Sequence, residues 1–256
     1  MSVSTTLSPA EALDLVRKIE LPEPTTRHGG LSQARKLQDH KEEAQVNNGS
    51  LVSFTNRLSG QNKEDVQNST LFAQLAANKQ VPDRSKNPIE WYNEYTRILS
   101  LVGWVFSNFA FDDYTSGGTT VRLDNAVLNI LGAIAAASEI ELVRSTMAAF
   151  DKLSDGTDQM RIWDSNSSNG NYGNFQIFPA DLEKNGDIIL LMAAMKFQAD
   201  NRVTRFLWWT WESKKIRIQR SATKLVLNNS IYAAVRQTVY DKVKDHIVKE
   251  VGDIPL

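Results

Sequence analysis

The segment Asp187-Ile-Ile-Leu-Leu-Met-Ala-Ala-Met-Lys-Phe197 decides the fold that we predict for this chain. Almost every position in it is apolar, whereas a strand with one face in water alternates apolar and polar residues. Apolar side chains on both alternating faces predict a strand that is covered on both sides. We therefore expect this segment to be the core strand of a sheet.

Tryptophan is concentrated just after this segment. Residues 203–211 alternate as a strand and contain Trp208, Trp209 and Trp211 among the six tryptophans of the chain. Indole rings with basic neighbours can anchor a protein at the headgroup level of a membrane. Indole rings also fill protein cores, and both interpretations stay open for these three side chains.

Basic residues follow the tryptophans on one side of a further predicted strand. Ile216 and Ile218 alternate with Lys215, Arg217 and Gln219, so that one face packs inward and the other meets water. Lys215 and Arg217 are candidates for contact with anionic lipid, because each basic residue near such a surface adds attraction. The alternative is an ordinary solvated strand face.

The N-terminal part of the chain predicts helices. Residues 1–67 are expected to be mostly helical and partly peripheral. Helices are predicted over 8–19, 31–46, 62–78 and 87–103. The capping pattern Ser8-Pro-Ala-Glu11 opens the first of them, and Gly103 ends the last.

A helical hairpin is predicted over 123–153, with an alanine-rich first helix over 123–137. Ile130 and Ile134 lie on that helix and are membrane-contact candidates, because such a hairpin could leave its sheet and enter a bilayer. An ordinary packed helix pair with alanine at the close contact has the same pattern. Both interpretations stay open.

The remaining chain predicts strands and a closing helix. Strands are expected over 104–111, 160–163, 172–178, 188–197, 203–211 and about 214–227, with a turn over 112–119 and a polar loop over 164–171. Valine and isoleucine spaced by four residues predict a helix over 228–252. The sequence thus predicts one α+β domain: an antiparallel sheet packed with N-terminal helices, a helical hairpin and a C-terminal helix.

Composition excludes several classes of function. The chain has 29 lysine and arginine residues against 30 aspartate and glutamate residues, so a general nucleic-acid binder is not expected. It has no cysteine, which removes thiolate metal sites and cysteine nucleophiles. No signal peptide or membrane-spanning segment is evident, and we expect a protein that is soluble, cytoplasmic in the producing cell and released by another route.

No catalytic constellation or cofactor motif is present, so the chain is not predicted to be an enzyme and no cofactor is expected. His28, His40 and His246 lack partners at metal-ligand spacing, and a surface position is expected for each. Asp112 and Asp113 could serve a hydrolase as acid and base, although adjacent acids at a strand end are usually a solvated turn.

The chain resembles the family of the Erwinia virulence factor and related bacterial proteins linked to insect-gut colonisation and insecticidal activity. The segments that carry the resemblance are Asn68-Ser-Thr-Leu-Phe-Ala-Gln-Leu-Ala-Ala-Asn-Lys79, Trp91-Tyr92, Leu101-Val-Gly-Trp104, Leu153-Ser-Asp-Gly156 and Asn169-Gly-Asn-Tyr-Gly-Asn-Phe-Gln-Ile177. The resemblance implies a non-enzymatic α/β protein that acts toward an insect host, and because its segments run from Asn68 onward, it implies a core over residues 68–256 of a single domain. The cysteine that carries a fatty acyl group in the Erwinia protein has no counterpart here. The order of helices and strands is also similar to that of Cyt-type cytolysins.

Two functions follow as hypotheses from these patterns. The first is a virulence or insecticidal protein that acts at host gut membranes, with lipid or membrane as partner, pore formation and oligomerisation on the membrane as possible steps, and an unassigned host receptor. The second is a lipid carrier that holds a fatty acid between the sheet and the helix of 228–252.

Overall fold

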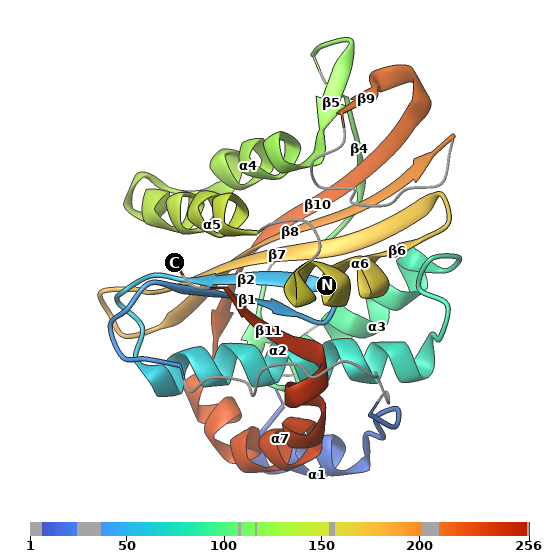
Figure 1. The fold of residues 1–256 in the computed structure, drawn as a ribbon. Helices are drawn as coiled ribbons and strands as arrows, with labels where there is room; N and C mark the ends of the chain where they lie inside the picture. The colour runs from blue at the N-terminus through green and yellow to red at the C-terminus, as the bar shows by residue number, and fades with distance from the viewer. Residues whose placement is uncertain are drawn as a thin grey trace, which may run out of the picture.

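A mixed β-sheet runs through the centre of the protein, which is described here as a computed structural model (Figure 1). The structure describes residues 7–24, 37–106, 109–115, 117–153, 157–200, 210–254 and 256. In these residues the sheet has nine strands, with the order β11-β1-β2-β7-β8-β10-β3, and β4 and β6 pair with β10 and β7. The strands are β1 (Glu43–Asn47), β2 (Ser50–Phe54), β3 (Trp104–Val105), β4 (Asp112–Tyr114), β6 (Ser168–Asn169), β7 (Tyr172–Leu182), β8 (Ile188–Ala199), β10 (Ile216–Leu227) and β11 (Val251–Ile254).

The central strand is the one that its sequence predicts. Strand β8 pairs antiparallel with β7 on one side and with β10 on the other, and its residues from Ile188 to Met195 are buried. Alternate side chains enter two different apolar clusters, Leu190 on one face and Leu191 on the other. The single α+β domain is therefore confirmed, with one parallel pair, β2 and β7, in an otherwise antiparallel sheet.

Helices cover both faces of the sheet (Figure 1). One side carries α1 (Pro9–Lys18), α2 (Gly60–Gln80), α3 (Pro88–Leu101) and α7 (Asn229–Glu250), and the other carries α4 (Leu123–Ile134), α5 (Ile140–Lys152) and α6 (Asp158–Ser167). A second sheet of two strands, β5 (Thr120–Arg122) and β9 (Thr210–Glu212), leads into α4. The predicted helices at the chain start, in the hairpin and at the chain end are confirmed.

Helix α2 is buried on nearly every side because it lies between the sheet and α7 (Figure 1). Its polar side chains are satisfied by neighbouring elements, as buried polar groups must be. Asn47 Nδ2 of β1 donates to Thr70 Oγ1 at 3.0 Å, and Gln74 Nε2 donates to Asn47 O at 3.1 Å. On the opposite side, Arg236 of α7 donates two hydrogen bonds to the Asp65 carboxylate.

Strand β1 corrects the C-terminal part of the predicted helix over 31–46. Glu43–Asn47 is a fully buried strand, and 31–36 lie outside the described residues. The polar side chains of β1 make its sequence look solvent-exposed. Glu43 and Asn47 bond to α2, whereas Ala44 and Val46 enter the core on the other face of the sheet. The pairing of β1 with β11, some 200 residues away in sequence, has no local signal.

Two shorter predictions are also wrong. Residues 160–163, expected as a strand, lie in α6, where the Thr157 hydroxyl accepts a hydrogen bond from the Met160 backbone N–H and caps the helix. Asp112–Tyr114, expected as a turn, is strand β4 on β10. The segment 160–163 has only four residues, and so short an apolar pattern does not distinguish a helix from a strand.

The buried ion pair between α2 and β1 predicts a large loss of stability on mutation. The Lys63 ammonium group is 3.0 Å from the Glu43 carboxylate and also donates to the backbone carbonyls of Gln38 and Lys41. Lys63→Met should lower the free energy of unfolding by about 3–5 kcal/mol, because a buried carboxylate then loses its cation. Urea denaturation measures this, with exposed Lys184→Met as control. A loss below about 1 kcal/mol would contradict this view of the pair.

Candidate functional site

The structure separates the residues that the sequence groups as membrane-contact candidates. Trp208 and Trp209 lie outside the described residues. Trp211 is in β9 and buried, with its ring centroid 6.0 Å from that of Phe197. Lys215 and Arg217 are exposed at the start of β10. On α4, Ile130 is fully buried and Ile134 is half-buried, and both face the sheet.

Arg217 borders a groove beside strands β7, β8 and β10. We call it the basic groove, lined by Tyr172, Lys196, Gln198, Arg217 and Gln219 among others, with a volume of about 200 Å³. Burial lowers the pKa of the Lys196 amine, and nearby Asp113 opposes this change. The groove presents three basic side chains, Lys86, Lys196 and Arg217, beside the exposed Tyr172, and such a set attracts anionic groups.

Helices α4 and α5 form a separate layer over one face of the sheet (Figure 1). Val127, Ile130 and Leu131 of α4 belong to the same apolar cluster as Ile189 and Leu191 of β8. Small polar contacts supplement this packing on α5, where the Ser145 hydroxyl is 2.9 Å from that of Ser53 in β2. The hairpin is thus attached mainly by apolar contact.

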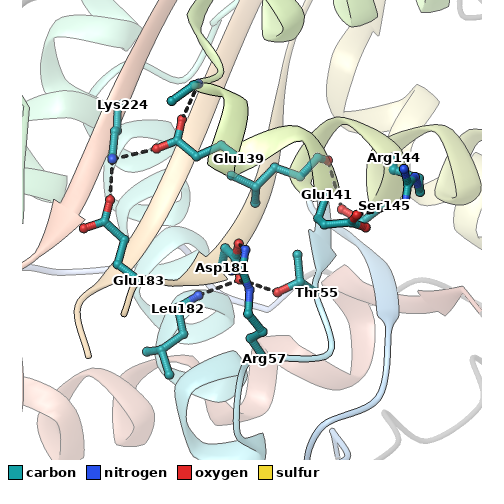
Figure 2. A network of polar contacts seen from close by, with 12 residues as sticks. Thr55, Arg57, Glu139, Glu141, Arg144, Ser145, Asp181, Leu182, Glu183 and Lys224 are labelled. Atoms are coloured by element: carbon teal, nitrogen blue, oxygen red, sulfur yellow. Dashed lines mark hydrogen bonds and ion pairs between the residues drawn. The ribbon is translucent and has the colours of Figure 1, made fainter. Parts of the chain in front are cut away.

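A lysine latch holds the connection between the two helices (Figure 2). Lys224 of β10 contacts the Glu139 carboxylate at 2.7 Å and the Glu183 carboxylate at 2.5 Å. Glu139 lies in the short 3₁₀ turn Ala137–Glu139 between α4 and α5, and Glu183 follows β7. We call Lys224, Glu139 and Glu183 the latch, since the lysine joins the hairpin to the sheet.

An open cleft borders the latch. It has a volume of about 360 Å³ and includes Glu139, Glu183 and Arg57. Arg57 is paired with buried Asp181 on the adjoining strand β7 (Figure 2). The connection between α4 and α5 therefore lies at a cleft that is open to solvent.

The latch groups have shifted pKa values. Burial raises the pKa of the Glu139 carboxyl, but hydrogen bonds from Lys224 and from the Ala136 backbone N–H outweigh burial and leave that pKa below its ordinary value. Burial lowers the pKa of the Lys224 amine, and the bonds to both carboxylates outweigh it, so that pKa is raised. The stabilisation from Glu139 is present above about pH 4.5 and is lost as the pH falls through the lowered pKa.

The structure places the two candidate acidic residues of the hydrolase alternative on the surface. Asp112 and Asp113 are exposed on β4, and Gln219 Nε2 donates to Asp113 Oδ1 at 2.8 Å. No group of three or more metal-binding side chains occurs among the residues described. His40 is exposed and His28 lies outside the described residues, but His246 is buried on α7, which corrects its predicted surface position.

The space expected for a fatty acid is occupied by protein. Helix α2 lies between the sheet and α7, and its apolar residues pack in the same cluster as Tyr232 and Val235 of α7. A lipid carried by this protein would need a different cavity. None of the described helices combines the length and apolar character required to cross a bilayer.

Three solved structures are similar to this fold. A delta-endotoxin aligns with 81% of this chain and 89% of its own at 12% identity, with a TM-score of 0.41. The Evf virulence factor aligns with 89% of this chain and 88% of its own at 12% identity, with a TM-score of 0.37. The activated Cyt2Ba monomer from Bacillus thuringiensis subsp. israelensis aligns with 53% of this chain and 79% of its own at 12% identity, with a TM-score of 0.35.

No family model matches the chain, and no curated protein sequence matches it. The resemblances to a virulence factor and to Cyt-type proteins are thus found as structural similarity at low identity. At 12% identity the similarity concerns the arrangement of helices and strands, and a shared fold does not by itself establish a shared function.

Sequence reasoning missed the latch and the serine contact. Lys224 is an ordinary polar residue of an alternating strand, and its two partners are 85 and 41 positions away. Ser53 and Ser145 are 92 positions apart. A local pattern carries no information on such pairs.

The latch predicts selective loosening of the hairpin. Lys224→Met should increase amide hydrogen exchange in α4 and α5 roughly fivefold, corresponding to about 1 kcal/mol for two partly solvated ion pairs. Exchange in α2 and α3 should not change. Lys215→Met is the matched control, because Lys215 pairs with Glu212 away from the hairpin. Equal exchange in wild type and Lys224→Met would show that the latch does not hold the hairpin.

Proposed function

We propose that this protein is a bacterial virulence or insecticidal protein that is released by the producing cell and acts at host gut membranes, without catalysis. The family resemblance of the sequence supports the host-directed role. The observation that supports the membrane step is the α4–α5 layer, which covers an apolar sheet face and has an apolar inner face itself.

The proposed step is separation of the α4–α5 hairpin from the sheet. In water this separation is unfavourable, because each Å² of apolar surface exposed costs about 25 cal/mol. At a bilayer the same surfaces enter hydrocarbon, and the cost is removed. Ile130, Ile134 and the facing residues Ile189 and Leu191 of β8 are the side chains that would exchange protein for lipid.

Anionic lipid would favour the approach to the membrane. Lys215 and Arg217 are exposed, and Arg217 lines the basic groove together with Lys196. Each basic residue near an anionic surface contributes about 1 kcal/mol of attraction within a Debye length. Binding should therefore weaken with added salt, whereas release of the hairpin depends on apolar burial.

A disulfide between α5 and β2 tests the separation directly. The hydroxyls of Ser53 and Ser145 are 2.9 Å apart and buried. The native chain has no cysteine, so the two introduced thiols can pair only with each other within one molecule. The double variant Ser53→Cys with Ser145→Cys should form a bond under oxidising conditions and hold the hairpin on the sheet. Release of dye from vesicles of phosphatidylcholine and phosphatidylserine should stop in the oxidised variant and return after reduction.

The controls separate locking from damage. Each single cysteine variant should release dye with or without reductant, and so should wild-type protein. Thermal unfolding of the oxidised double variant establishes that it is folded. If the oxidised, folded variant releases dye as fast as the reduced one, the hairpin is not the membrane-active element. If wild-type protein releases dye from no vesicle and feeding leaves insect larvae unharmed, the proposed function itself is wrong.

A further inference from the structure

A polar cleft lies where the β1–β2 turn meets α2, α6 and α7. Its volume is about 650 Å³, within the ~300–1,000 Å³ range of small-molecule sites. We define this polar cleft by Glu23, Asn48, Arg84, Asn166, His246 and Glu250. It contains no residue of the α4–α5 hairpin or the latch, and it shares only Ser85 with the lining of the basic groove.

The inner end of the polar cleft is fixed before any ligand arrives. Glu250 ends α7 and is buried, and its carboxylate accepts hydrogen bonds from Asn48 Nδ2 at 3.0 Å and from Asn166 Nδ2 at 3.4 Å. Asn48 has φ 54° and donates its backbone N–H to Glu250 O at 2.7 Å. The turn at Asn48 is thus bonded to the end of α7 through both its backbone and its side chain, and these two hydrogen bonds hold the Asn48 amide in place.

His246 lies one helical turn before Glu250 and lines the same cleft. Only 3% of this residue is exposed, yet its Nδ1 has no hydrogen-bond partner among the described residues. Burial lowers the pKa of the imidazole, so it is neutral at pH 7. A buried polar atom without a partner is unfavourable by about 1–3 kcal/mol, and a ligand that bonds to Nδ1 would remove that penalty.

Charges of both signs border the polar cleft. The Arg84 guanidinium lies 3.9 Å from the Trp91 ring centroid and donates to the carbonyls of Asn166 and Asn174. It fits there because Gly49 has no Cβ, which would meet the Arg84 side chain at 2.4 Å. Glu23, Asp83 and Glu250 place carboxylates on the same cleft, and the Asp83 carboxylate pairs with the Lys86 ammonium group at 3.1 Å. These carboxylates would repel an anion, whereas a neutral hydroxyl can accept from the guanidinium and donate to a carboxylate.

Asparagine and serine supply much of the remaining lining. Their amides and hydroxyls offer donors and acceptors together, which match groups that are donor and acceptor at once. Hydroxyl groups on a neutral ring have this property. We propose that the polar cleft is a binding site for a neutral saccharide, with His246, Asn166 and Glu250 as its main hydrogen-bonding side chains.

The proposed site does not rest on the membrane step, and it would give the protein affinity for glycosylated surfaces. The probes are D-glucose, D-galactose, D-mannose and N-acetyl-D-glucosamine, each titrated alone up to about 20 mM, a range that detects a dissociation constant of about 1 mM. In ¹⁵N-labelled wild-type protein, at least one sugar should shift the His246 ring signals and the Asn48 and Asn166 side-chain signals saturably.

Two variants and one control make the titration specific. His246→Phe and Asn166→Ala should each weaken binding about tenfold, because each removes a hydrogen bond to the sugar. Gln198→Ala, in the basic groove, should bind as wild type does. If a variant fails to fold, the wild-type His246 signals still decide the question. The proposal is overturned if none of the four sugars shifts these signals, if both folded variants bind as tightly as wild type, or if inorganic phosphate competes for the cleft.

Discussion

The structure depends on one constraint: strand β8 has apolar side chains on both faces, so the sheet must be covered twice. Leu190 and Met192 face the α2 and α3 side, while Ile189 and Leu191 face α4 and α5. On the first side the cover is deep, because α2 is itself covered by α7 and carries buried polar bonds to the sheet. On the second side α4 and α5 form one layer that meets water on its outer face. The helices on the α2 side are therefore attached to the sheet by more kinds of contact than α4 and α5 are, and we expect α4 and α5 to separate from the sheet more readily.

This asymmetry explains where the polar contacts are placed. Polar bonds within the α2 side are buried and numerous, and removing one partner leaves a desolvated group behind. Around the hairpin the Ser53–Ser145 hydroxyl contact is buried, whereas the ion pairs of the latch are partly exposed through Lys224, whose side chain is 36% accessible. Ion pairs in such surroundings add little free energy, but they respond to pH and to an anionic surface. This layer, held by apolar contact and bordered by partly exposed charge, is the element that we propose to move from water into lipid.

The sequence predicts much of this architecture, and its failures have a common physical origin. Long periodic segments such as β8, α4, α5 and α7 were identifiable because many residues repeat one pattern. Strand β1 was not, since Glu43 and Asn47 are buried by partners on α2 that local sequence does not reveal. His246 was placed on the surface for the same reason, because the turn at Asn48 and the end of α6 that enclose it are distant in sequence. The alternating pattern correctly predicts that Lys215 and Arg217 are exposed to solvent. It does not predict the latch or the polar cleft, because their residues are far apart in sequence.

The distance between α5 and the rest of the protein tests the central claim most directly. Spin labels on Met147→Cys in α5 and Tyr240→Cys in α7 occupy exposed positions, 48% and 45% accessible, in a chain without other cysteines. Pulsed electron resonance should give one distance in water and a longer one when vesicles of phosphatidylcholine and phosphatidylserine are added. An unchanged distance in protein that is bound to the vesicles and releasing dye would contradict separation of the hairpin from the sheet.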